Sequence, residues 1–366
     1  MTEIEKKNKD RKFRLTNKTF KFPKAIREHF YTANYFVKTM KIAEHHLADT
    51  VVTMQFFQRR DDVMVCGVDE AIALLQEFAK KPEQLKIEAC YDGDIVNANE
   101  PVLKITGLYK DFGFLESLID GILTRRTNAA TNSYEVLRAA YPTEVFSMAD
   151  RQDDYLTQAG DGYASYIAGI KKFSTDAQGA WVGIKGMGTM PHALIAMTNG
   201  DLIKACEIYH QTFPNEKISA LVDYHNDTVT QALEVARHFG PKLGSVRLDN
   251  SKALLDEYFV RAGLNDQNLK GVSPELVFAV RDALDKEGFH YVNIVVSSGF
   301  NPEKIRYFKS KNAPVNLYGV GSHIVNAKEV GFTGDVVAVN GKPEAKVGRQ
   351  EYFSDKLEKV TLKPRV

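Results

Sequence analysis

The sequence predicts an α/β fold in which a parallel sheet forms an incomplete α/β barrel beside an N-terminal α+β domain. Four runs in the second half of the chain are apolar and β-branched, and the first three are each followed by a segment with helical spacing. Successive β-then-α units produce a parallel sheet that is buried on both faces. Roughly five or six candidate strands are present, fewer than the eight of a complete barrel.

Each of the four runs stops on residues that can bind a ligand or take part in catalysis. In order, these residues are Asp223, the pair Arg247 and Asp249, the turn Ser297-Ser298-Gly299, and the glycines Gly319 and Gly321. The active site of an α/β barrel is built from the loops at the carboxyl ends of its strands, and the last two often hold phosphate. The pattern therefore indicates an enzyme that acts on a phosphorylated sugar. Arg247 and Asp249 lie two residues apart and share one face of a strand, so a buried ion pair is the alternative.

The first third of the chain alternates helical and extended patterns, which favours an α+β domain. The amphipathic helix expected near its middle opens with Asp69 and Glu70, whose negative charge suits the positive end of a helix. The expected elements are helices over 25–46 and 68–81, strands over 51–58, 63–67, 84–90 and 100–107, and a long helix over about 114–140. The last two strands are expected to pair in antiparallel fashion.

The β/α series is expected to begin with a strand at 143–149 and to run to about residue 325. Its expected helices are 199–212, 227–239, 251–262, 274–288 and 302–311. After the series, Asn340-Gly341 lies between two strand-like arms, which is a strong hairpin signal, and this hairpin is expected to rejoin the first domain. The predicted domains are a basic polar tail (1–24), an N-terminal α+β domain (25–140, rejoined by 330–366) and the catalytic barrel domain (141–329).

Composition argues against several other classes of protein. Lys plus Arg is 48 and Asp plus Glu is 47, so no charge bias indicates nucleic acid or membrane as a partner. Cys66, Cys90 and Cys206 form no C-x-x-C pattern, which argues against a zinc site or a disulfide scaffold. The basic start has no apolar core and no long apolar run follows, so neither a signal peptide nor a membrane span is expected. We expect a cytoplasmic protein with a solvated N-terminal tail.

His192 follows a glycine-rich turn and opens a helix-like run in "GMGTMPHALI". Gly186, Gly188 and Thr189 allow phosphate oxygens to approach backbone N–H groups. A neutral imidazole is also an effective phosphoryl acceptor. The alternative is a structural histidine. Arg151, which lies among three acids, and Asp176, which lies in a loop, are more typical of a surface when each is taken alone.

Five ordered motifs resemble the nicotinate phosphoribosyltransferase family. They are "GTMPHALI" with His192, "LVDYHND" (221–227), "GSVRLDNS" (244–251), "IVVSSGF" (294–300) and "VNLYGVGS" (315–322), and the resemblance extends from about residue 47 to 350. The broader group includes nicotinamide and quinolinate phosphoribosyltransferases. The resemblance implies a type II phosphoribosyltransferase fold, in which a sandwich domain precedes an incomplete barrel. It also implies a homodimer with the site near the subunit interface.

The resemblance implies transfer of a phosphoribosyl group from phosphoribosyl pyrophosphate to nicotinate in NAD synthesis, with ATP as co-substrate and Mg²⁺ as cofactor. His192 matches a histidine that ATP phosphorylates. Arg247 and Asp249 match a pair near the ribose and pyrophosphate, and Asp223 matches an acid on the same face. The remaining matches are Ser298, Gly299, Gly319 and Gly321 for the 5-phosphate, and Arg151 beside the pyridine ring. Thr189 and Asp176 are further substrate-binding candidates, and no metal ligand is assigned.

Three positions depart from the family pattern. Met148-Ala149 stands where a phenylalanine-glycine pair is common, and Thr50 stands where a tyrosine is usual. Asp176 places a carboxylate in the loop typical of nicotinate enzymes, where it would accept a hydrogen bond from an amide. A nicotinamide or quinolinate enzyme therefore stays open, although the histidine counts against the quinolinate reaction. A catalytically weak nucleotide-binding sensor is the alternative from another class.

Overall fold

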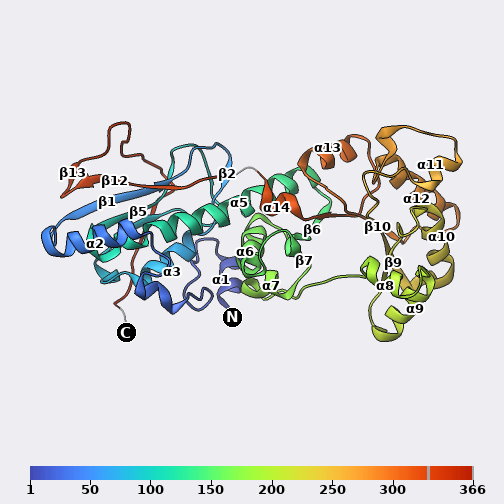
Figure 1. Cartoon of the computed structure of the whole chain (residues 1–366), viewed down its shortest axis with the longest axis horizontal. Helices are drawn as coiled ribbons and strands as arrows, with labels where there is room; N and C mark the ends of the chain where they lie inside the picture. The colour runs from blue at the N-terminus through green and yellow to red at the C-terminus, as the bar shows by residue number, and fades with distance from the viewer. Residues whose placement is uncertain (328–329, 365–366) are drawn as a thin grey trace.

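The chain forms an elongated molecule with one large sheet in each half (Figure 1). The structure is a computed structural model and describes residues 1–327 and 330–364. The predicted domain junction at residue 329 and the predicted domain end at residue 366 lie outside these described residues. Within them, no helix is long and apolar enough to cross a membrane.

The sheet of the C-terminal half consists of six parallel strands. They are β6 (Glu144–Ser147), β7 (Lys172–Phe173), β8 (Ile218–Leu221), β9 (Leu243–Leu248), β10 (Asn293–Val296) and β11 (Leu317–Val320). Their order in the sheet is β7-β6-β11-β10-β9-β8. Because the last strand pairs with the first, the strands follow their sequence order around a curled sheet that stays open between β7 and β8. This arrangement confirms the predicted incomplete barrel.

Helices connect these strands. They are α6 (Gln158–Ala168), α7 (Asp176–Gly179), α8 (His192–Met197), α9 (Leu202–Thr212), α10 (Thr228–Phe239), α11 (Glu257–Arg261), α12 (Pro274–Lys286), α13 (Pro302–Ser310) and α14 (Ser322–Asn326). The predicted helix over 251–262 is reduced to α11. The reason is local, since the Asp256 side chain accepts a hydrogen bond from Tyr258 N and therefore caps the helix just before Glu257.

The N-terminal half is built on an antiparallel sheet. Its strands are β1 (Val51–Phe57), β3 (Lys86–Ala89), β5 (Pro101–Leu108), β12 (Thr333–Val339), β13 (Lys342–Pro343) and β14 (Glu358–Val360). The predicted pairing of the strands near 84–90 and 100–107 is confirmed by β3 and β5. The predicted hairpin is also confirmed, because Asn340 and Gly341 both have positive φ and join β12 to β13, while β12 pairs with β1.

The helices of this half are α1 (Glu3–Lys9), α2 (Asn34–His46), α3 (Val68–Phe78), α4 (Tyr109–Phe112) and the long α5 (Glu116–Ala140). A small second sheet pairs β2 (Val63–Met64) with β4 (Ile95–Val96). The predicted helix over 25–46 is wrong in its first part. A 3₁₀ turn at Lys24–Glu28 ends where His29 adopts a left-handed backbone conformation, and such a residue stops a helix.

The predicted solvated tail is also wrong, because residues 1–24 pack against the rest of the chain. Leu15 and Phe20 are each 1% exposed. Lys7 Nζ donates to Asp69 Oδ2 at 2.7 Å and Arg14 donates to Asp69 Oδ1 at 3.0 Å. Asp69 is fully buried, and a buried carboxylate needs paired cations. The basic residues of this segment therefore neutralise an acid of the N-terminal half.

Apolar side chains form two separate buried clusters, one beneath the antiparallel sheet and one around the parallel sheet. The predicted division is into an N-terminal domain, residues 25–140 with 330–366, and a barrel domain, residues 141–329, although Met64, Cys66 and Ala130 of the first belong to the barrel-side cluster. We retain that division as a proposal, with residues 1–24 packed against the barrel-side cluster through Ile4, Leu15 and Phe20.

Glu116, at the start of α5, is expected to make the stability of the fold depend on pH. Burial, together with the charges of Asp120 and Asp335, raises its pKa from 4.5 to about 8. The folded chain therefore holds this proton more tightly than the unfolded chain, so stability is greatest below pH 4.5 and is lost as the pH rises towards 8. Glu116→Gln should raise Tm at pH 8 and leave it nearly unchanged at pH 4, as measured by thermal unfolding. An equal gain at both pH values would show a packing effect instead.

Candidate active site

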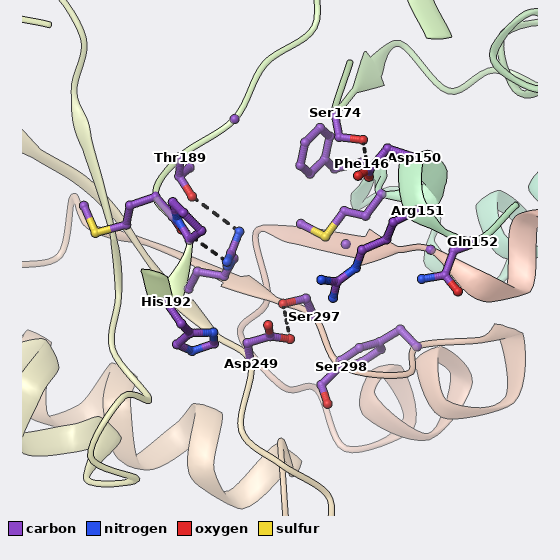
Figure 2. Close-up of a pocket in the computed structure, with 18 of the residues that line it drawn as sticks. Phe146, Asp150, Arg151, Gln152, Ser174, Thr189, His192, Asp249, Ser297 and Ser298 are labelled. Atoms are coloured by element: carbon purple, nitrogen blue, oxygen red, sulfur yellow. Dashed lines mark hydrogen bonds between the residues drawn. The ribbon is translucent and has the colours of Figure 1, made fainter. Parts of the chain in front are cut away.

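A cavity of about 590 Å³ lies at the carboxyl ends of the barrel strands (Figure 2). It is lined by Phe146, Met148, Asp150, Arg151 and Gln152 after or at the end of β6, by Ser174 after β7, by residues 187–193, by Arg247 and Asp249, by residues 297–300, and by Gly319, Gly321 and Ser322. This is the edge of the sheet at which the sequence predicts a site. All the predicted site residues line the cavity except Asp223 and Asp176.

Arg247 points from β9 into the cavity without a carboxylate partner. Among the described residues its guanidinium makes only two long contacts, at 3.4 Å each, to Thr189 Oγ1 and the Met190 carbonyl. Its Nε is buried and has no acceptor among the described residues. Burial lowers the pKa of Arg247, although the charges of Asp249 and Asp223 oppose this. The ion pair considered from the sequence is not formed among the described residues, and the guanidinium remains available to an anionic ligand.

Asp249 is instead held by a hydroxyl group. Ser297 Oγ donates to Asp249 Oδ1 at 2.8 Å, from the end of the neighbouring strand β10. The carboxylate is therefore fixed beside Arg247 without being neutralised by it. This arrangement presents a cation and an anion to the same cavity as two separate groups.

His192 and Asp223 form a pair across the opening between β7 and β8. His192 Nε2 lies 3.1 Å from Asp223 Oδ2. The Asp223 carboxyl is buried, which raises its pKa, whereas the nearby His192 lowers it. A carboxylate at this distance favours the tautomer with the proton on Nε2. The lone pair of a neutral His192 is then on Nδ1, the nitrogen that is not paired with Asp223.

Backbone N–H groups without acceptors gather at the other end of the cavity. Ser298 and Gly299 have φ angles of 79° and 69°, so the chain turns sharply after β10. The N–H groups of Ser298, Gly299, Phe300 and Gly321 donate to no acceptor among the described residues. Successive N–H groups in such a turn form a concave site for an anion. The turn after β10 and the glycine after β11 are therefore suited to a phosphate group.

Comparison with known proteins agrees with this geometry. A nicotinate-nucleotide pyrophosphorylase of Pyrococcus furiosus is 30% identical over 90% of this chain and 80% of its own, with a TM-score of 0.77. The chain belongs to the nicotinate and quinolinate phosphoribosyltransferase family. Residues 33–127 match the family model described as quinolinate phosphoribosyl transferase, N-terminal domain.

Two further relatives of this phosphoribosyltransferase are nicotinate enzymes by name. A nicotinate phosphoribosyltransferase of Mycobacterium tuberculosis is 23% identical, over 91% of this chain and 74% of its own. The human nicotinic acid phosphoribosyltransferase is 16% identical, over 88% of this chain and 77% of its own, with a TM-score of 0.68. The human structure supports the fold alone, which is the type II phosphoribosyltransferase fold expected from the sequence.

The part of the cavity near Arg151 contains residues that the sequence did not single out. Ser174 Oγ donates to Asp150 Oδ1 at 2.6 Å, and the Phe146 ring lies beside them, while the Arg151 side chain extends into the cavity (Figure 2). The sequence could have indicated Phe146 as a cavity residue, because Phe146 lies two residues before Met148 and alternate residues of a strand share one face. Ser174 was missed as a cavity residue because β7 is only two residues long.

Asp176 lies outside the cavity. Its carboxylate accepts from the backbone N–H of Gly186 at 2.8 Å and lies 3.4 Å from Lys185 Nζ. The side chain is 68% exposed. The hydrogen bond from Gly186 and the charge of Lys185 hold its pKa below the usual range. Asp176 thus holds the glycine-rich loop in place, and the geometry does not support the predicted contact with a substrate.

A Mg²⁺ ion in this cavity would have to be held mainly by its substrate. Among the described residues, no group of three His, Cys, Asp or Glu side chains is placed to hold a metal. Mg²⁺ retains several waters and is commonly bound through substrate phosphates and one or two carboxylates. Asp249 is a carboxylate in the cavity that fits this requirement.

The Gly321 backbone should be essential for binding a phosphate at this end of the cavity. A Cβ at Gly321 would lie 2.8 Å from the Met148 carbonyl oxygen, so the end of β11 must shift. Gly321→Ala should weaken the binding of ribose 5-phosphate at least about tenfold in calorimetry, the scale of a lost charge-assisted hydrogen bond. Gly121→Ala is the matched control, because a Cβ there meets nothing within 4 Å. Unchanged affinity in a folded Gly321→Ala variant would place the phosphate elsewhere.

Proposed function

We propose that this protein is a nicotinate phosphoribosyltransferase of NAD synthesis. It would transfer the 5-phosphoribosyl group of phosphoribosyl pyrophosphate to the ring nitrogen of nicotinate and release pyrophosphate. The observation that carries the proposal is the presence of two anion-binding groups in one cavity: the unpaired Arg247 guanidinium and the free N–H groups around Ser298-Gly299. A donor with a pyrophosphate at one end and a 5-phosphate at the other matches both.

The names of the relatives support the same reaction. The Mycobacterium tuberculosis protein is named for nicotinate and for phosphoribosyl transfer. The Pyrococcus furiosus protein is named for nicotinate nucleotide and pyrophosphate, which are the two products of the proposed reaction. The second name gives the products but not the pyridine that accepts the phosphoribosyl group, so it supports phosphoribosyl transfer and not the choice of nicotinate over quinolinate.

The residues of the cavity can stabilise the charges that develop during transfer. Displacement at the anomeric carbon builds positive charge on the ribose and negative charge on the leaving pyrophosphate. Arg247 is placed to stabilise the leaving group. Asp249, oriented by Ser297, is placed to orient ribose hydroxyl groups. Fixed groups aimed at developing charge are usually the largest single contribution to catalysis, and a bound Mg²⁺ would neutralise further charge on the pyrophosphate.

The residues near Arg151 are proposed to hold the pyridine ring. The Arg151 guanidinium can pair with the carboxylate of nicotinate, and Phe146 supplies an aromatic ring that Met148 does not. Quinolinate has a second carboxylate, which would need a further cation near the ring. The cationic side chains among the described lining residues are only Arg151, Arg247 and, when protonated, His192. This small number counts against quinolinate as the substrate. One observation favours nicotinamide as the alternative substrate, since the Asp150 carboxylate lines the cavity and can accept a hydrogen bond from an amide.

We also propose that ATP phosphorylates His192. The Nδ1 lone pair would attack the γ-phosphorus as the bond to the ADP oxygen breaks, and ADP would leave. The proton on Nε2 would stay hydrogen-bonded to Asp223, whose carboxylate balances the positive charge of the phosphorylated ring. Phosphoryl transfer requires little beyond positioning and charge stabilisation. The homodimer with the site near its interface stays a prediction from the family resemblance.

Pyrophosphate release with each pyridine tests the proposed function. With phosphoribosyl pyrophosphate and Mg²⁺, we expect release with nicotinate, slower release with nicotinamide and none with quinolinate. Arg247→Ala should lower turnover at least about a hundredfold, the scale of losing one charge-stabilising donor, while exposed Arg306→Ala serves as the control. Faster release with nicotinamide would reassign the substrate, and none with any pyridine would favour a nucleotide-binding sensor.

Labelling with ATP that is radioactive on its γ-phosphate tests the phosphohistidine. The label should appear on the protein at neutral or alkaline pH and disappear in acid, because a phosphohistidine is acid-labile. His192→Asn should abolish both the label and ATP hydrolysis but leave slow transfer without ATP, since the sites for ribose and phosphate remain. A label that persists in His192→Asn would identify another residue as the acceptor.

A further inference from the structure

Lys304 is a half-buried lysine that lies behind the phosphate-binding turn and does not line the cavity. It belongs to the first turn of α13. Its Nζ donates to the Ser298 carbonyl at 3.0 Å and lies 4.3 Å from the centre of the Phe300 ring. Burial lowers its pKa to about 8, although the charge of Asp249 opposes this. Among the described residues no carboxylate forms a salt bridge with it, so this cation is only partly neutralised.

The carbonyl that Lys304 contacts belongs to a strained turn. Ser298 has a φ of 79°, a region that residues other than glycine rarely occupy. Strained residues persist when several contacts hold them in place. For Ser298 these contacts are the hydrogen bond from its Oγ to the Asn250 carbonyl, at 3.1 Å, and the bond from Lys304 to its own carbonyl. Lys304 therefore helps to hold the peptide group that joins Ser298 to Gly299.

The orientation of that peptide group decides where its N–H points. In a planar trans peptide the C=O and the following N–H point in opposite directions. Lys304 holds the Ser298 oxygen on the α13 side, so the Gly299 N–H must point away from α13. Gly299 lines the cavity, and its N–H has no acceptor among the described residues. The ammonium also polarises the peptide, which makes its N–H a stronger donor.

We propose that Lys304 is a positioning residue for the 5-phosphate of the substrate. Its ammonium holds the Ser298-Gly299 peptide with the N–H towards the phosphate, and it places a positive charge directly behind the turn. The proposal rests on the proposed function for the identity of the ligand as a ribose 5-phosphate group. If instead Lys304 only anchors α13, removing the charge of the Lys304 side chain should not change the affinity of the protein for ribose 5-phosphate.

Calorimetry with two separate ligands tests this role. Ribose 5-phosphate is the probe for the turn, and inorganic pyrophosphate is the probe for the Arg247 end of the cavity. Lys304→Met retains the apolar stem and removes the ammonium. It should weaken the binding of ribose 5-phosphate at least about tenfold, the scale of losing one hydrogen bond to a charged group. It should change the affinity for pyrophosphate less than about twofold. Lys304→Arg should restore most of the loss, and the exposed Lys311→Met is the control.

Kinetics on the whole enzyme separate positioning from loss of structure. Lys304→Met should raise KM for phosphoribosyl pyrophosphate and leave kcat nearly unchanged. Normal ribose 5-phosphate binding in Lys304→Met, or an equal loss of both ligands in it, would overturn the proposal. If Lys304→Met does not fold, Lys304→Gln keeps a hydrogen-bond donor without the charge and should still bind ribose 5-phosphate more weakly than Lys304→Arg. If the unmutated protein binds ribose 5-phosphate but turns over no pyridine, the proposed function is overturned. The role of Lys304 in binding the phosphate is not.

Discussion

The pairing of β11 with β6 is the constraint on which the rest of the barrel depends. It joins the last strand of the β/α series to the first, and the bond from Met148 N to the Val320 carbonyl, at 2.8 Å, extends the pairing beyond β6. This contact brings the loop that carries Arg151 beside Gly321. A Cβ at Gly319 would lie 2.7 Å from Met148 Cε, so both glycines allow the two strand ends to approach. Because the sheet closes here, its opening lies between β7 and β8, where His192 and Asp223 meet.

Arg247 has no partner of opposite charge among the described residues, which contrasts with two carboxylates of the N-terminal half. Two buried carboxylates of the N-terminal half are paired with cations, Asp69 with Lys7 and Arg14, and Glu70 with Arg126. In the cavity, the half-buried Arg247 has no carboxylate partner among the described residues, and its Nε is buried without an acceptor. A partly enclosed charge without a partner is costly. We therefore propose that the unpaired cation and the free N–H groups at the other end of the cavity together bind an anion with more than one phosphate.

The strand ends of the barrel were predictable because the β/α alternation and the polar residue after each strand are both local in the sequence. The region around Ser174 was not, because β7 has two residues and because neighbouring side chains diverge there. A capping box between Thr175 and Gln178 starts α7, and it sends Ser174 towards Asp150 and leaves Asp176 facing Gly186. The packing of residues 1–24 was not predictable either, because the buried Asp69 that attracts their cations is distant in sequence.

The positions of Asp150 and Arg151 bear on how a cavity with an acidic residue could take the acidic substrate that we propose. Asp150 and Arg151 are adjacent in the chain, yet Asp150 bonds to Ser174 and not to Arg151. One oxygen of Asp150 accepts the Ser174 hydroxyl, and the Asp150 carbonyl accepts from Gln158 Nε2 at 2.9 Å. Asp150 is thus tied to the β7 side of the cavity, whereas Arg151 extends towards its centre (Figure 2). We propose that a pyridine carboxylate pairs with Arg151, whereas a ring substituent that lies against Ser174 would meet Asp150. On this proposal, discrimination between acid and amide depends on which of the two side chains the ring substituent faces.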